Sequence, residues 1–173
     1  LSTTIEPSGS DYHERLDRLF IASDERALLQ MDKEGTLDDI WSMGGDNEGV
    51  AIADDTTDLI YVGIENPDSI VEFDFVQGIE TRTFDLTPWM ASSASNQGLE
   101  ALTFVPAADS LEGGYFLAGL QETGDIYIFE LPIESSSTLE TVVYVGKIDP
   151  MPGYTDIAGL DYDPVQDLVY AVY

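Results

Sequence analysis

A short acidic motif recurs along this chain and could supply ligands for a hard metal ion. In three copies an acidic residue stands three positions before a glycine: Glu6-Pro-Ser-Gly9, Asp46-Asn-Glu-Gly49 and Asp156-Ile-Ala-Gly159. In a further copy, over residues 98–104, Glu100 aligns with Glu48 and Ala101 takes the glycine position. Ca²⁺ takes about 6–8 oxygen ligands from carboxylates, amides and carbonyls. Carboxylates that converge in space would favour a bound cation, because the cation relieves their mutual repulsion.

A second series of polar residues follows the hydrophobic run after each motif and extends the candidate ligand set. It comprises Glu25, Glu65 and, in the third repeat, Gln121. The acidic residues of both series are the expected metal ligands: Glu6, Glu25, Asp46, Glu48, Glu65, Glu100 and Asp156. The alternative for each residue is a structural role, in which its carboxylate caps a turn or accepts backbone N–H groups.

Catalytic sites of other kinds find little support in the residue types. The chain has no cysteine and a single histidine, His13, whereas zinc favours Cys and His and a Ser-His-Asp triad requires His. His13 follows Asp11-Tyr12 in an expected surface turn, so we expect its side chain to be exposed. Paired carboxylates could act as general acid and base, but the sequence does not give their separation.

Short β-strands are the elements expected to position these acids. A hydrophobic strand follows each motif, at residues 19–22, 59–62, 115–118 and 168–171. Third strands are expected at residues 28–32, 70–74 and 126–130, and fourth strands at residues 37–43, 80–86 and 139–145. Glycine and aspartate interrupt most stretches that would be long enough for a helix.

Four strands in a repeat of about 40 to 45 residues are typical of a β-propeller blade. The blades are expected at residues 5–45, 46–90 and 96–149, with a partial fourth at 154–173. The sequence therefore predicts an all-β propeller of four-stranded antiparallel blades, about three and a half of them, in one domain over residues 1–173. The motif strand should be innermost. Because closure takes about four to eight blades, we expect a further chain or another copy to complete the ring; an open β-sandwich is the alternative.

The charge of the chain limits its partners. Its 173 residues include 34 acidic and 6 basic ones, which gives a net charge of −28 at pH 7. Nucleic-acid binding needs a basic face, so this class of partner is excluded. Insertion into a membrane is not expected either, because no apolar run reaches the roughly 18 to 20 residues of a span. Self-repulsion of this size favours either a high-salt setting or bound divalent cations; the alternative is an ordinary acidic, solvated surface.

The repeated segments carry a family resemblance. Glu6-Pro-Ser-Gly9 with residues 19–25, and residues 46–50 with 61–65, resemble the first blades of the SdiA-regulated propeller family, which is similar to the esterase-like phytase domains. Residues 96–102 and 156–162 resemble the next two blades. The resemblance implies a longer, exported bacterial protein, and some propellers of this kind hold calcium in the central channel.

These observations predict an exported, acidic propeller module that lies outside the cytoplasm, in the periplasm, at the cell surface or in the medium. It would bind a small ligand or a protein partner, with calcium in or near the central channel. One alternative is a metal-dependent phosphoesterase or esterase of the phytase-like type, in which the metal polarises the ester. Another is a structural segment of a larger surface protein. Whether the chain is an enzyme stays open.

Overall fold

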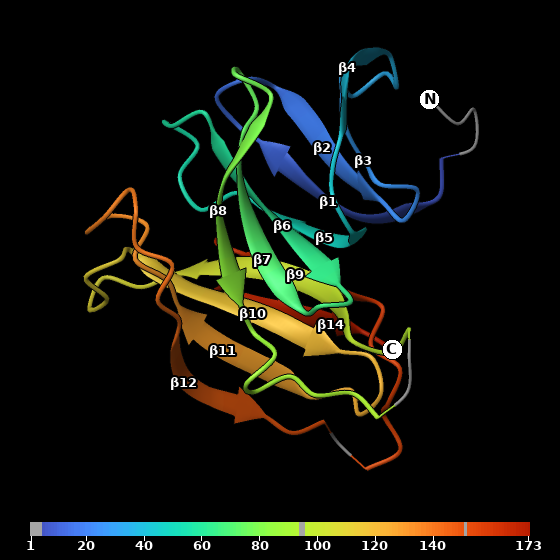
Figure 1. Ribbon diagram of the computed structural model, residues 1–173, viewed down its shortest axis with the longest axis vertical. Coiled ribbons are helices and arrows are strands. Elements are labelled where there is room, and N and C mark those ends of the chain that lie inside the picture. The colour runs from blue at the N-terminus through green and yellow to red at the C-terminus, as the bar shows by residue number, and fades with distance from the viewer. Residues whose placement is uncertain (1–4, 94–95, 151) are drawn as a thin grey trace.

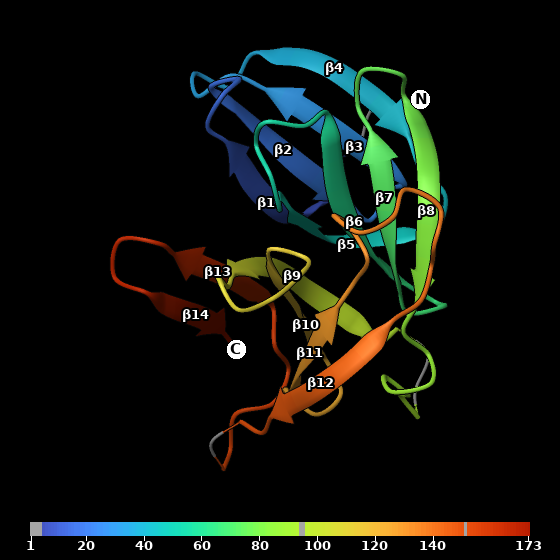
Figure 2. The same ribbon diagram turned by 90° about the vertical axis from the view of Figure 1, so that its left-hand side faces the viewer.

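The apolar runs of the sequence form β-strands in four antiparallel sheets (Figures 1 and 2). A computed structural model describes residues 5–93, 96–150 and 152–173. The first sheet consists of β1 (Pro7–His13), β2 (Arg18–Ser23), β3 (Ala27–Met31) and β4 (Leu37–Ser42). The second consists of β5 (Asp46–Ala51), β6 (Leu59–Glu65), β7 (Ser69–Asp74) and β8 (Ile79–Asp85).

The third and fourth sheets differ in their number of strands. The third consists of β9 (Leu99–Pro106), β10 (Gly114–Leu120), β11 (Ile126–Glu130) and β12 (Val143–Ile148). The fourth contains β13 (Gly159–Asp163) and β14 (Leu168–Val172), the last strands of the described chain. The prediction of an all-β propeller with about three and a half four-stranded blades is thus confirmed, and the sheets do not close into a ring. No helix in the described part of the chain could span a membrane.

The outer strand of the third sheet begins later than the sequence pattern predicts. The pattern places a strand at residues 139–145, whereas β12 spans Val143–Ile148. The chain before it forms a loop over the second sheet, where the Arg82 guanidinium donates hydrogen bonds to the carbonyls of Pro132, Ser136 and Leu139 at 2.8, 2.8 and 3.1 Å. These carbonyls are therefore satisfied by a side chain instead of a neighbouring strand.

The first strand of each sheet lies innermost, where it meets the first strands of the adjacent sheets. β1 contacts β5, β5 contacts β9, and β9 contacts β13. The recurring glycines permit this approach. A Cβ atom on Gly9 would lie 2.7 Å from the carbonyl oxygen of Glu48, and one on Gly49 would lie 2.6 Å from the Cβ of Leu102. Glycine stands at these two positions because the neighbouring backbone leaves no room for a side chain.

Apolar cores fill the space between neighbouring sheets. The core between the first and second sheets includes Phe20, Leu28, Val71 and Phe73. The core between the second and third sheets contains the buried residues Ile70, Phe84, Leu86, Phe116 and Phe129. A smaller cluster between the third and fourth sheets contains Ala101, Leu117, Ile126 and Ile157. The second and third sheets therefore each cover a face of the sheet before them.

Candidate metal centre

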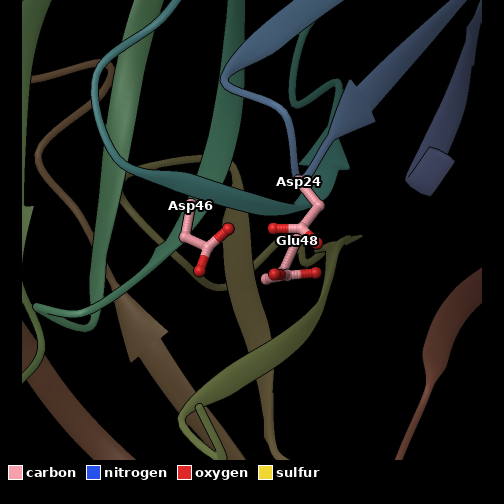
Figure 3. Close-up of side chains that lie close together, drawn as sticks. All are labelled: Asp24, Asp46 and Glu48. Atoms are coloured by element: carbon pink, nitrogen blue, oxygen red, sulfur yellow. The ribbon is translucent and has the colours of Figure 1, made fainter. Parts of the chain in front are cut away.

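Three carboxylates converge beside the inner strands (Figure 3). Asp24, Asp46 and Glu48 each offer a ligand oxygen, and these three oxygens lie within 4.8 Å of one another. Two ligands of one Ca²⁺ ion, each at about 2.3–2.6 Å, lie up to about 5 Å apart. The three oxygens are therefore close enough to bind a single cation together.

Backbone pairing brings these carboxylates to the same place. The ladder between β5 and β6 pairs Asp46 with Glu65 and shifts its register between Asn47 and Gly49. Such a bulge changes the direction in which side chains point. Here residues 46 and 48, on either side of Asn47, both direct their carboxylates toward Asp24. Asp24 follows β2, and its amide donates to the Glu6 carbonyl at 3.2 Å, which extends the pairing with β1 by one residue.

Burial and mutual repulsion raise the pKa values of this region. Burial, followed by a hydrogen bond and the charge of Asp24, raises the pKa of Asp46 to about 7. Burial and the charge of Glu100 raise the pKa of Glu48 to about 7. Burial, then the charges of Glu65 and Asp156, raises the pKa of Glu100 to about 7 as well. The carboxylates thus form one electrostatically linked group, in which a proton or a cation is favoured at neutral pH.

The remaining expected ligands have different surroundings. Glu65 is buried, and its carboxylate accepts hydrogen bonds from the amide of Gly98 and, at 2.9 Å, from the Asn66 side chain. These hydrogen bonds give Glu65 a structural role, because one of them ties the end of β6 to Gly98, directly before β9. Glu6, Glu25 and Asp156 are exposed, and none belongs to the group of three.

Asp24 is the member of the group that the sequence analysis missed, since it placed Glu25 in this series. The antiparallel ladder explains the difference. β1 and β2 pair Pro7 with Ser23, so Asp24 lies across from Glu6, as Glu65 lies across from Asp46. Counting back from the acidic motif across the hairpin, instead of forward along the second strand, would have indicated Asp24.

A cavity of about 630 Å³ opens between the inner strands and reaches this group. Glu48 and Glu100 line it, and Asp161 lines it from β13. Aromatic and apolar side chains form much of the remaining wall, among them Tyr12, Leu19, Ile21, Leu102, Leu160, Tyr170 and Val172. The cavity is therefore the partly enclosed axial channel, with acidic groups on otherwise apolar walls.

The position of His13 contradicts the expected exposed turn. His13 is the last residue of β1 and is fully buried, with its ring centroid 5.9 Å from that of Phe20 and 5.7 Å from that of Phe75. The strand thus includes His13 instead of ending before it, and the imidazole packs in the aromatic core. Burial lowers the pKa of His13, which favours the neutral ring.

The raised carboxyl pKa values predict that acidification stabilises the cation-free protein. Between pH 8 and about pH 6, the folded chain binds protons at Asp46, Glu48 and Glu100 that the unfolded chain, with pKa values near 4, does not bind. The free energy of unfolding should therefore rise as pH falls through 7. Thermal unfolding in EDTA, followed by circular dichroism from pH 8 to pH 5, measures this dependence.

A double variant and the titration of His13 test this prediction further. The double variant Glu48→Gln and Glu100→Gln should show a flatter dependence above pH 6, since two of the titrating groups are gone. Below about pH 6.5, protonation of His13 in the unfolded chain should reduce the gain, because its folded-state pKa is lowered. A melting temperature that climbs steadily from pH 6 to pH 8 would contradict the predicted sign.

Comparisons with known proteins show a similar fold in solved structures but no family to which the chain belongs. No family model and no curated protein matches the chain. A chain in the crystal structure of the mitotic checkpoint complex aligns with 96% of this chain at a TM-score of 0.63 and 12% identity. The structure of U3-55K aligns with 100% of it at a TM-score of 0.58 and 8% identity. This chain spans 46% and 53% of those two chains, so its likeness to them is that of a partial β-propeller.

Proposed function

We propose that this chain is an acidic β-propeller module that binds a protein partner and holds a calcium ion at Asp24, Asp46 and Glu48. The observation that carries the cation site is the approach of three ligand oxygens to within 4.8 Å. Oxygen ligands of this kind suit a hard cation, and the net charge of −28 favours one further. The charge of Glu100 would add to the attraction for the same ion, since it already raises the pKa of Glu48.

The fold supports a protein partner. A similar fold occurs in the mitotic checkpoint complex, an assembly in which it is one component. Two chains of about twice this length share the fold, which supports a ring completed by further strands. The resemblance to SdiA-regulated propellers and the location outside the cytoplasm belong to the same proposal. They rest on the repeated acidic motifs that carry the resemblance.

Calcium is expected to raise the melting temperature of the chain by about 5–10 °C at a concentration 100 times its Kd. A ligand that binds only the folded state stabilises it by mass action, and about 2–4 °C corresponds to each kcal/mol in a chain of this size. A calcium titration followed by differential scanning fluorimetry, at constant ionic strength set with NaCl, measures the shift. Isothermal titration calorimetry gives the stoichiometry.

Variants separate a specific site from general screening. The double variant Asp46→Asn and Glu48→Gln should lose most of the calcium-dependent shift. The double variant Glu34→Gln and Asp39→Asn is the matched control, because both carboxylates are exposed and their loss changes the net charge by the same two units without touching the cluster. The cation site would be disproved if calcium and matched NaCl gave equal shifts in melting temperature, or if the Asp46→Asn and Glu48→Gln double variant kept the full shift.

A further inference from the structure

One buried polar side chain between the first two sheets lacks a full set of hydrogen bonds. Asn47, on β5, is 0% exposed. Its amide nitrogen donates a hydrogen bond to the carbonyl of Ala27, the first residue of β3, at 3.4 Å. Its amide oxygen has no hydrogen-bond partner within the described part of the chain. An unpaired buried oxygen costs stability, so a polar residue at this position needs a physical reason.

The other repeats show that this position can be apolar. The ladder of the second sheet skips Glu48, and the ladder of the third sheet skips Glu100. Leu99 is therefore the equivalent of Asn47, since each directly precedes the skipped residue. In the last repeat Ile157 stands at the same place, two positions before the glycine of the motif. Leu99 and Ile157 are both 0% exposed, as Asn47 is.

An apolar side chain at this position packs against the preceding sheet. A Cβ atom on Gly63 of β6 would lie 2.5 Å from Cδ2 of Leu99. A Cβ atom on Gly119 of β10 would lie 2.9 Å from Cγ2 of Ile157. Asn47 also reaches the preceding sheet, but it meets that sheet with a hydrogen bond. Leucine or isoleucine would bury more apolar area there and leave no polar atom unpaired.

The hydrogen bond from Asn47 joins the two segments that carry the three carboxylates of the candidate metal centre. Asp46 and Glu48 flank Asn47 on β5 (Figure 3). Asp24 lies in the turn between β2 and β3, three positions before Ala27. A backbone hydrogen bond of 3.0 Å closes this turn. A bond to Ala27 therefore also restrains the short turn that carries Asp24.

We propose that Asn47 is a positioning residue for the calcium site: its amide holds the turn between β2 and β3 against β5, so that Asp24 meets Asp46 and Glu48. This inference rests on the proposed cation site and names a residue that maintains its geometry. Residues that orient metal ligands through hydrogen bonds commonly affect metal affinity without touching the ion. The unpaired oxygen of Asn47 is then the cost of placing a hydrogen-bond donor at an otherwise apolar position.

Replacing Asn47 with the residue of the third repeat separates positioning from stability. Asn47→Leu loses the amide and gains the apolar side chain found at Leu99. Its melting temperature in EDTA should equal or exceed that of the unsubstituted chain, because the unpaired buried oxygen is gone. Its Kd for calcium should rise roughly three- to tenfold, the factor that corresponds to a lost hydrogen bond. Isothermal titration calorimetry with CaCl₂ on the metal-free full chain measures this Kd.

Two further variants exclude indirect effects. Asn47→Ala also lacks the amide, and because alanine is smaller than asparagine it cannot overpack the core. It should melt at a lower temperature and show the same rise in Kd. Val71→Ala is the matched control, since Val71 is buried in the core between the same two sheets but lies on β7, outside both the turn and β5. It should lower the melting temperature and leave the Kd for calcium unchanged.

Three results would overturn the proposal, and they differ in what else fails. Absence of calcium binding by the unsubstituted chain would remove the proposed cation site together with the role of Asn47. Calcium binding by that chain, with a Kd within about twofold in either Asn47 variant, would remove the role of Asn47 alone. An equal rise in Kd for Val71→Ala and Asn47→Ala would assign the effect to a loosened core instead of a positioned turn.

Discussion

The variant Arg82→Met is expected to lower the free energy of unfolding by about 3–5 kcal/mol, the cost of breaking a buried ion pair from one side. Arg82 is 4% exposed, and its guanidinium binds the carboxylate of Glu72, which is 3% exposed, through two nitrogens. Glu72 also accepts from the hydroxyl groups of Thr81, at 2.6 Å, and Tyr61, at 3.0 Å. Although burial raises its pKa, the bonds from Arg82 and Thr81 hold the pKa of Glu72 below its usual value.

The loss extends beyond Glu72, because Arg82 also ties the second sheet to the loop before β12. Its three hydrogen bonds to the carbonyls of Pro132, Ser136 and Leu139 would all be missing in the variant. The loss of these three bonds adds to the cost. Urea denaturation of both proteins, read from tryptophan fluorescence, measures the difference in stability.

Two further variants make this result specific. Arg15→Met removes an exposed pair with Asp58 and should cost less than about 1 kcal/mol. Glu72→Gln combined with Arg82→Met should cost less than the sum of the single variants, since the two residues interact directly. A loss below about 1 kcal/mol for Arg82→Met would show that the pair and its carbonyl contacts do not hold the sheets together.

The strands and their repeat could be predicted because their signals are local. A run such as residues 59–62, bounded by polar turn residues, indicates a strand without reference to the rest of the chain. The repetition of four such runs indicates the blade. These inferences need no knowledge of which side chains meet.

The residues that the sequence analysis missed depend on contacts distant in sequence. Asp24 joins Asp46 and Glu48 through strand register, and a single bulge changes which carboxylate faces the channel. His13 is buried by Phe75, which comes 62 positions later in the chain. Arg82 would be taken for a surface residue, yet Glu72 on the neighbouring strand and the loop after the third sheet's β11 enclose it. Burial of polar groups is decided by partners that a local pattern does not specify.

The recurring glycines test how closely the inner strands of neighbouring sheets must pack. The variant Gly49→Ala is expected to lower the free energy of unfolding by about 3 kcal/mol, because its Cβ would lie 2.6 Å from the Cβ and 2.8 Å from the backbone nitrogen of Leu102. A backbone atom cannot move aside as a flexible side chain can. β5 would have to move away from β9, against the contacts that join the second and third sheets.

Gly146→Ala is the matched control, since a Cβ atom there has no neighbour within 4 Å. It should change stability by less than about 0.5 kcal/mol. Moving β5 away from β9 would also separate Glu48 from Glu100, whose charges are coupled across these two strands. Gly49→Ala should therefore weaken the pH dependence of stability above pH 6 as well as stability itself. If urea denaturation shows equal stability for both alanine variants, the inner strands can separate freely and the close approach at Gly49 does not hold the second and third sheets together.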